Sequence, residues 1–504
     1  MVIIMSGKTK QSEFNKVLTA KDMLVIAFGA MIGWGWVVSS GDWIQRGGVV
    51  GAALGFALGG VMIYFVGMTY SELTAALPQC GGEHVFSHKA FGPTGSFICT
   101  WGIIFGYAGV VCFEACALPT IIGYLFPGFL KGYLYTVAGF DIYASWLGVA
   151  MAAAVFMTWI NIIGVKTAAN MQTLFTVVII AVGLAIIGVS AVRGDTANIL
   201  PQMFVSNDEG GVIKHVIRVA VTTPFFFIGF DVIPQAAEEI KGSLKKIGMY
   251  LIISVVMAVL FYGLVIIAVG YMLNPQEIAE GMQGNGLVTA NVMVKAFGSK
   301  AVGNVVIIGG LCGIVSSWNS FMIGGSRAMY SMADSNMIPK AFAWLHPKYK
   351  TPVNALILIG IFSMLSPLAG RQMLVWISDA GNLGCCVAYC MVSLSFIILR
   401  KKEPNMPRPL VVKNYKLIGW LAVILSGGMV VCYIIPGSGS TLAPQEWAMA
   451  GGWALLGAIF YFREKKKYGK DFGKHVDIEI EYSEEDLISI KENQKIVDKE
   501  NGIK

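Results

Sequence analysis

The chain has 504 residues, of which 56% are hydrophobic and only 13% are charged; its formal net charge is +7 and its mean hydropathy is +0.67. Because a soluble globular domain carries about 25% charged residues, this composition excludes an ordinary soluble protein and indicates a chain embedded in a lipid bilayer. The five histidines are dispersed, and no protease, hydrolase, P-loop or metal-ligand pattern occurs, which argues against a membrane enzyme, an ATP-driven pump, a metal site and a cofactor.

Apolar runs repeat along almost the whole chain, and a membrane-spanning helix needs about 20 mostly apolar residues. We count twelve candidate runs, of which two or three are short enough to be interrupted or tilted. No connector between them could hold a soluble domain, so we predict an all-α polytopic membrane protein with twelve transmembrane helices. The runs are residues 23–38, 49–68, 95–125, 143–163, 173–192, 216–233, 249–272, 302–323, 353–368, 374–399, 417–436 and 447–462.

The distribution of lysine and arginine predicts the orientation, because these residues are enriched in cytoplasmic loops. With an even number of spans, both termini lie on one side. The segments on that side carry 29 of the 37 basic residues, and the opposite side carries 8. We therefore expect a plasma-membrane protein with both termini in the cytoplasm. The same asymmetry explains the net positive charge without a nucleic-acid partner.

The first apolar run contains an unusual concentration of glycine. Residues 28–41 read Phe-Gly-Ala-Met-Ile-Gly-Trp-Gly-Trp-Val-Val-Ser-Ser-Gly, with Gly29, Gly33 and Gly35 inside a predicted span. Each glycine weakens a helix by about 1 kcal/mol relative to alanine, and backbone groups freed by a break need other partners inside a membrane. Two interpretations follow: a helix interrupted for a polar ligand, or glycines that allow tight helix packing.

The third run contains an acidic residue, Glu114. A carboxylate inside a span costs roughly 2.5–3.5 kcal/mol on insertion scales, so such a residue usually faces a cavity or a partner. The run is long enough that Glu114 could also lie near the outer interface. The sequence leaves both positions open.

The sixth run is the second stretch that disfavours a continuous helix. It reads Thr-Pro-Phe-Phe-Phe-Ile-Gly-Phe-Asp-Val-Ile-Pro from residue 223, and it places Pro224, Gly229 and Pro234 around Asp231. Proline removes a backbone donor and clashes with the preceding turn. Paired interruptions at corresponding positions of two halves are a pointer to a transporter site, although two unrelated kinks would give the same pattern. Helix N-termini there would suit a carboxylate, and freed carbonyl groups would suit an ammonium group, so the pair fits an α-amino acid.

Several motifs together resemble those of the amino acid–polyamine–organocation (APC) family of permeases, over residues 21–462. The most specific follows the eighth run and matches the pattern SRxxYxMA…LP…HPKxxTP. The matching segments are Gly29-Ala-Met-Ile-Gly-Trp-Gly35, Pro78 with Gly81-Gly82, Phe227-Ile-Gly-Phe-Asp231 with Ala237-Glu-Glu239, residues 326–334, Ile338-Pro339, residues 346–352 and the basic, proline-rich loop 400–409.

The resemblance implies the leucine-transporter-like fold, in which two inverted five-helix repeats are followed by two more helices and helices 1 and 6 are interrupted. On this basis the chain divides into a cytoplasmic N-terminal segment (1–21), repeat 1 (22–200), repeat 2 (201–400), helices 11 and 12 (401–463) and a cytoplasmic tail (464–504). The polar, mixed-charge tail is expected to be partly disordered, either a solvated extension or a regulatory element.

The resemblance also implies a substrate site. The substrate carboxylate should meet backbone N–H groups, and the amino group should meet carbonyl oxygens near Met31 and on span 6. Phe225 sits where relatives place a gating aromatic residue, and Asp231 falls where some relatives have an acidic residue tied to proton-dependent gating. Glu114 is a further candidate for coupling or gating. The residues implied are Gly33, Trp34 and Gly35 for the carboxylate, Met31, Phe225 and Ile228 for the amino group, and Trp34, Phe225, Phe226 and Phe227 for an aromatic border that favours an uncharged substrate.

Some positions depart from the family pattern. Trp34 stands where many relatives have a small hydroxyl residue, so its indole should narrow the pocket or turn away from it, and His84 replaces the usual tyrosine. Some relatives carry a lysine midway along helix 5 that stands in for a coupling cation; our alignment places Ile179 there. Sodium, a proton and obligatory exchange therefore remain as ways to drive transport. Serines 316, 317 and 320 could contribute to a sodium site, but serines inside spans are more often packing or hydrogen-bonding groups.

The sequence thus predicts a secondary active transporter of amino acids that works by alternating access and is coupled to protons as a symporter, with amino acid or amine exchange as the alternative. A channel would need a continuous polar pore, whereas polar residues here gather at mid-span breaks. Asp231 is the better-placed titratable group, because burial disfavours the charged form of a carboxyl group and so allows it to load and release a proton.

Overall fold

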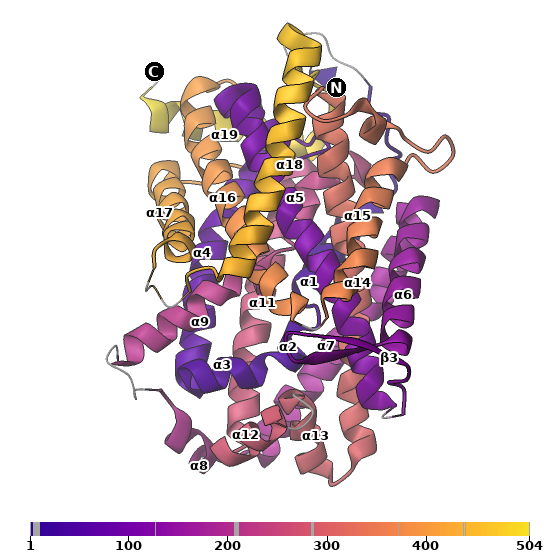
Figure 1. The fold of residues 1–504 in the computed structure, drawn as a ribbon. Coiled ribbons are helices and arrows are strands. Elements are labelled where there is room, and N and C mark those ends of the chain that lie inside the picture. Colours follow the sequence, from indigo (N-terminus) through magenta and orange to yellow (C-terminus); the bar gives the residue numbers. More distant parts are fainter. Residues whose placement is uncertain are drawn as a thin grey trace.

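A computed structural model of the chain describes residues 2–3, 11–126, 128–205, 211–283, 287–370, 372–436, 438 and 440–502. These residues form a helical bundle with three small two-stranded sheets (Figure 1). The helices are α1 Ala20–Met31, α2 Gly35–Val38, α3 Ser40–Gly47, α4 Val49–Ala76, α5 Glu83–Leu125, α6 Ala144–Ile163, α7 Val165–Arg193, α8 Thr196–Ile199, α9 Gly211–Phe227, α10 Val232–Gln235, α11 Leu244–Met272, α12 Pro275–Gln283, α13 Val288–Phe297, α14 Lys300–Asp334, α15 Val353–Leu365, α16 Met373–Lys402, α17 Tyr415–Ile434, α18 Pro444–Tyr468 and α19 Glu484–Asn501. The strands pair as β1 Val2–Ile3 with β6 Ile480–Glu481, β2 Leu18–Thr19 with β5 Ile240–Lys241, and β3 Tyr133–Val137 with β4 Phe140–Tyr143.

Ten helical segments within the described residues are long and apolar enough to cross a membrane, and they coincide with ten of the twelve predicted runs. The other two runs are also helical. Residues 353–368 form the shorter apolar α15 and the 3-10 turn after it, and residues 447–462 lie in α18, which is rich in glycine and tryptophan. The protein is therefore an all-helical, multi-pass membrane protein, and the total of twelve spans stays a prediction.

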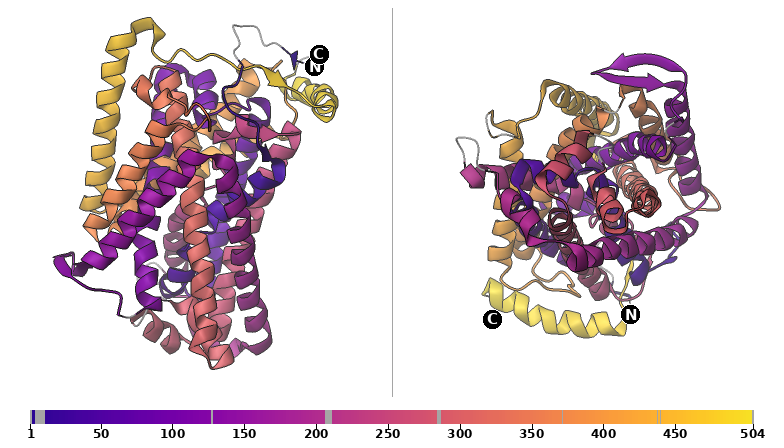
Figure 2. Two further views of the ribbon diagram at one scale, coloured as in Figure 1. Left: turned by 90° about the vertical axis from the view of Figure 1, so that its right-hand side faces the viewer. Right: turned by 90° about the horizontal axis from the view of Figure 1, so that it is seen from below.

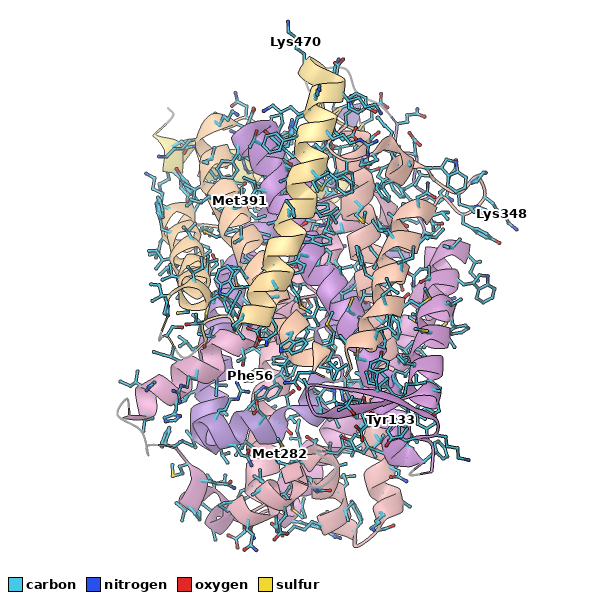
Figure 3. All side chains as sticks on the ribbon, viewed as in Figure 1. Phe56, Tyr133, Met282, Lys348, Met391 and Lys470 are labelled. Carbon is cyan, nitrogen blue, oxygen red and sulfur yellow. The ribbon has the colours of Figure 1, made fainter. Side chains whose placement is uncertain are left out.

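Both termini lie at the same end of the bundle, which we call the terminal end (Figures 1 and 2). Lys348 and Lys470 project there, whereas Tyr133 and Met282 lie toward the opposite end (Figure 3). Helices α8, α12 and α13 and the β3–β4 hairpin belong to the opposite end. The bundle is held together by contacts between helices distant in sequence, chiefly α5 with α16 and α14, α4 with α11 and α9, and α7 with α14; α1 packs against α7, α11 and α14.

Helix α5 begins earlier than the sequence suggested and contains a sharp bend. Glu83 already belongs to it, and Gly92 has φ of 77°, a left-handed conformation that glycine adopts at little cost. The predicted span 95–125 follows the bend. The bend lets the first turns of α5 carry Glu83 and His84 into the interior, where both side chains are buried.

Buried ion pairs close the bundle between its centre and the terminal end. Arg327 Nε of α14 lies 2.8 Å from Glu239 Oε1, and both side chains are almost fully buried. The backbone of the N-terminal segment joins this closure, since Val17 N donates to Glu239 O and strand β2 pairs with β5. Nearer the terminal end, Glu72 of α4 accepts two hydrogen bonds from Arg400.

The C-terminal segment differs from the predicted, partly disordered tail, because it is folded and packed against the terminal end. Helix α19 starts with a capping box formed by Ser483 and Asp486, and Asp486 also accepts hydrogen bonds from the backbone N–H groups of Leu244 and Lys245. Near its other end, Glu500 bonds to Arg400. Composition alone indicated a solvated segment; these specific partners on α11 and α16 order it (Figure 2).

The docking of this segment is expected to weaken at acidic pH. His475 packs against both His84 and His88, with ring centroids 5.7 Å apart in each pair, and its Nε2 lies 2.9 Å from Gln79 Oε1. Burial, followed by the neighbouring His88, lowers the pKa of His475 from 6.5 to about 4. In the undocked segment this histidine binds a proton at its ordinary pKa, so docking is favoured above pH 6.5 and is lost progressively as the pH falls toward 4.

Limited proteolysis or hydrogen exchange of residues 471–501 across this pH range measures the effect. The carboxylates of Asp477 and Asp334 also face His475, and they oppose the lowering of its pKa. A His475→Gln variant, which lacks the titrating ring, is the matched control. We expect a steeper pH dependence in the wild type than in the variant. Equal pH dependence in both proteins would contradict a role for His475.

Candidate functional site

The first apolar run forms two helices separated by a short non-helical stretch. Helix α1 starts with a capping box formed by Thr19 and Asp22 and ends at Met31, and α2 starts at Gly35. The N–H of Ile32 still reaches Phe28 O. The N–H groups of residues 33–35 donate no hydrogen bond to any described residue. Buried N–H groups are almost always paired in proteins. The unpaired donors of this stretch are therefore available to a ligand.

The sixth run shows a comparable stretch. Helix α9 contains Pro224 and ends at Phe227, and α10 starts at Val232. The N–H of Gly229 donates to Asp231 Oδ1 at 2.9 Å instead of continuing the helical pattern. Among the described residues, no hydrogen bond to the carbonyl oxygens of Phe225 or Ile228 is recorded, which leaves these acceptors free.

The second non-helical stretch meets the end of α1 at Gly229. Its φ is +136°, and a Cβ atom built on it would lie 2.7 Å from Ala30 Cβ and 2.9 Å from Met31 N. Only glycine therefore fits, for reasons of both conformation and space. The close approach brings the end of α1 and the end of α9 into one place at the centre of the bundle.

Glu114 and Ser317 complete the surroundings of Gly33. A Cβ atom on Gly33 would lie 2.7 Å from Glu114 Oε1 and 3.2 Å from Ser317 Oγ. Glu114 is 2% exposed, and its Oε2 has no partner within the described part of the chain. Of the two positions left open by the sequence, the structure places Glu114 against α1 rather than at the outer interface.

Other predicted residues have neighbours that the sequence did not indicate. The indole of Trp34 lies against Gly310 of α14 and so turns into the helix packing. The carbonyl of Met31 accepts a hydrogen bond of 2.7 Å from Tyr262 Oη, which occupies part of its accepting capacity. Phe227 is fully buried and packs against Phe56 and Tyr262, with centroids 5.7 Å apart in both pairs.

Asp231 lies on the terminal side of the meeting point and is fully buried. Its Oδ2 accepts a hydrogen bond of 3.0 Å from Tyr389 Oη of α16. A second buried carboxyl group, Glu83, is close enough to interact electrostatically with it and accepts a hydrogen bond from Gln235. Sequence reasoning did not single out Glu83, because it follows two glycines in what read as a connector.

The polar groups of α7 that reach α1 were also missed. Gln172 and Thr176 lie against Gly29, and Gln172 Nε2 donates to Ser316 Oγ at 2.6 Å. Gln172 precedes Ile179, the position that the alignment had suggested. Ser316 Oγ donates to Gly29 O, and Ser320 Oγ donates to Ile26 O. In this structure these two serines serve as hydrogen-bonding groups between helices.

A cavity of about 480 Å³ lies on the opposite side of the meeting point from the terminal end. We call it the outer cavity. Its polar wall contains Asp42, Arg46 and Asn382, and Arg46 Nε is 2.8 Å from Asp42 Oδ2. The remaining walls come from α2, α3, α5, α9, α16 and the β3–β4 hairpin, and the residues are Val38, Ser39, Trp43, Phe113, Ala138, Gly139, Phe140, Thr222, Phe225, Phe226, Gln372, Leu374, Val375, Ser378 and Asp379.

Phe225 belongs to the last turn of α9 and lines the outer cavity. The centroid of its ring lies 5.2 Å from the ring centroid of Phe113 and 5.5 Å from that of Phe226. If this aromatic group occludes a bound substrate, Phe225→Ala is expected to raise the apparent KM for uptake by about tenfold, the effect of losing about 1.4 kcal/mol of interaction. Phe91→Ala, at an exposed position of α5, serves as the control. Wild-type kinetics in Phe225→Ala for all tested substrates would show that the ring only packs.

Residues 22–472 match a family model described as amino acid permease. The chain is 25% identical over 476 residues to the branched-chain amino acid permease BcaP of Bacillus subtilis. The aligned region covers 93% of this chain and 97% of that protein. The chain is 24% identical over 480 residues to the methylthioribose transporter of the same organism, with 92% and 96% covered. A third relative, the aspartate-proton symporter of that organism, is 24% identical over 435 residues, with 84% and 80% covered.

Proposed function

The chain belongs to the amino acid permease family, and from that premise we propose that it is a secondary active transporter that binds an amino acid where α1 and α2 meet α9 and α10. Membership makes it a membrane transporter rather than an enzyme. The relatives carry names of chemically different substrates, including branched-chain amino acids, aspartate and methylthioribose. The names therefore do not select a substrate for this chain.

The observation that carries the proposal is the set of free N–H groups at Gly33, Trp34 and Gly35. We treat α1 with α2, and α9 with α10, as two interrupted spans. The start of α2 directs N–H groups and a positive helix end toward a carboxylate. The free carbonyl groups of Phe225 and Ile228 and the nearby Glu114 favour the ammonium group. Together these groups match the charge pattern of an α-amino acid.

We propose alternating access, which the closure at the terminal end and the cavity on the other side support. Contacts between Arg327 and Glu239 and between β2 and β5 close the path toward the terminal end, while the outer cavity leads to Phe225. We propose that repeats 22–200 and 201–400 rearrange around the fixed site and that residues 401–463 add two peripheral helices. The excess of basic residues at the terminal end supports a plasma-membrane orientation with both termini, 1–21 and 464–504, in the cytoplasm.

We favour proton coupling through Asp231, with exchange of amino acids as the alternative. Asp231 is a buried carboxyl group with two hydrogen-bond donors and no ion pair within the described part of the chain, and intramembrane carboxyl groups of this kind serve in proton relays. Our alignment places the neutral Ile179 where some family members carry a lysine, and Gln172, which reaches α1, is neutral as well. The hydroxyl groups of Ser316 and Ser320 donate to α1 carbonyls, which makes a sodium site there less favourable.

Counterflow into proteoliposomes tests the transport function. Vesicles containing the purified protein and preloaded with an unlabelled amino acid should take up the labelled compound transiently and with saturation. A channel would give no counterflow, and an unrelated membrane protein would give no uptake. Failure of all 20 common amino acids and simple amines in this assay would overturn the proposal.

A further inference from the structure

Asn382 is a buried amide group with no hydrogen-bond partner. It belongs to α16, is 1% exposed and contributes to the wall of the outer cavity. Neither its side-chain oxygen nor its side-chain nitrogen has a partner within the described residues. Leaving both ends of a buried amide unpaired is unfavourable, and a partner that restores both bonds is strongly preferred.

Several other polar groups in the outer cavity already have partners. Arg46 and Asp42 form an ion pair with each other, and Ser378 Oγ donates to Val375 O on its own helix. Much of the remaining wall is aromatic, with Trp43, Phe113 and Phe225 among its members. The wall therefore combines a large aromatic surface and the carboxyl group of Asp379 with a buried amide, Asn382, that lacks a partner within the described residues.

We infer that Asn382 binds the side chain of the substrate and that the substrates are amino acids whose neutral side chains both donate and accept hydrogen bonds, such as carboxamides or alcohols. The inference rests on the proposed function, because it assumes that the amino acid backbone is held near Gly33. An amide oxygen accepts and an amide nitrogen donates. A carboxylate only accepts and an ammonium group only donates, so either would leave one end of Asn382 unpaired.

An apolar side chain would leave both ends unpaired, and this gives Asn382 its power to discriminate. A site built to hydrogen-bond a substrate group rejects the analogue that lacks the group far more strongly than an apolar pocket rejects an added hydroxyl. Two pairs of nearly isosteric amino acids isolate this effect: asparagine with leucine, and threonine with valine.

The experiment compares kcat/KM for uptake of the two members of each pair in proteoliposomes. We expect the wild type to favour asparagine over leucine and threonine over valine by about tenfold or more. Asn382→Leu keeps the side-chain volume but removes both hydrogen bonds, so both ratios should fall below one. Asn382→Ala removes the same hydrogen bonds with a smaller side chain and should also lower both ratios. Asn161→Leu is the matched control, because Asn161 is a buried asparagine of α6 that lies outside the cavity wall, and it should leave the ratios unchanged.

Two results would overturn the inference: a wild type that prefers leucine and valine, or ratios that remain unchanged in both Asn382 variants. Either result leaves the proposed function standing, since amino acids are still transported. A wild type that transports no amino acid would instead remove the proposed function, and this inference with it.

Discussion

Replacing Gly35 with leucine is expected to abolish amino acid uptake while the protein remains folded. A Cβ atom at this position would overlap the ring of Phe226, so the substitution displaces either the start of α2 or the aromatic wall of the outer cavity. Both changes move the N–H groups that we assign to the substrate carboxylate. Misplacing a binding group by 1 Å can cost about a hundredfold in rate, and we expect a loss of at least that size in kcat/KM for uptake.

Gly188→Leu is the matched control for this prediction. Gly188 lies in α7, and nothing lies within 4 Å of the position that its Cβ would occupy. The same change in side-chain size there should leave uptake unchanged. Uptake and size-exclusion profiles of both variants separate loss of function from loss of fold. Normal uptake by a monodisperse Gly35→Leu protein would contradict the proposed site.

Replacing Asp231 with asparagine is expected to abolish accumulation driven by a proton gradient. The substitution keeps the size of a side chain that is fully buried but removes the group that would carry the proton. Substrate binding near Gly33 should survive, so counterflow should continue while uphill uptake stops. The measurement is uptake into sodium-free vesicles that are acidic outside, and accumulation is expected to fall to the level without a gradient.

An Asp195→Asn variant controls for the loss of a carboxylate elsewhere, because Asp195 caps the short helix α8. Two outcomes would count against proton coupling. If a sodium gradient drives accumulation and a proton gradient does not, the coupling ion is sodium. If uptake requires preloaded internal substrate whatever the gradient, the protein is an exchanger and Asp231 has at most a gating role.

Local backbone rules applied to the sequence predict a break near residue 33 and another near residue 229. Glycines near residue 33 and the cluster of Pro224, Gly229 and Pro234 disfavour a helix wherever they occur, and α1 and α9 end at Met31 and Phe227. The unpaired backbone groups at these points follow directly from the loss of helical hydrogen bonds. What such rules cannot give is the neighbour that each group meets.

The neighbours depend on how each helix is rotated against the others, and a single sequence does not contain that information. Tyr262 reaching Met31, Gln172 reaching α1 and the unpaired Asn382 all arise from contacts between helices far apart in the chain. The prediction that the C-terminal segment is partly disordered was wrong for a related reason. Its composition is that of a solvated tail, and only its partners on α11 and α16 reveal that it is ordered.

Binding of an amino acid to the purified protein tests the central claim most directly. A ligand that binds only the folded state stabilises it by about 2.7 kcal/mol at 100 times its Kd, so a screen of amino acids by thermal shift should find at least one that raises the melting temperature. The shift should disappear in Gly33→Val, whose side chain would meet Glu114 and Ser317, and persist in Gly188→Val. A wild type that no amino acid stabilises, or an equal shift in a folded Gly33→Val protein, would contradict a substrate site at the junction of α1, α2, α9 and α10.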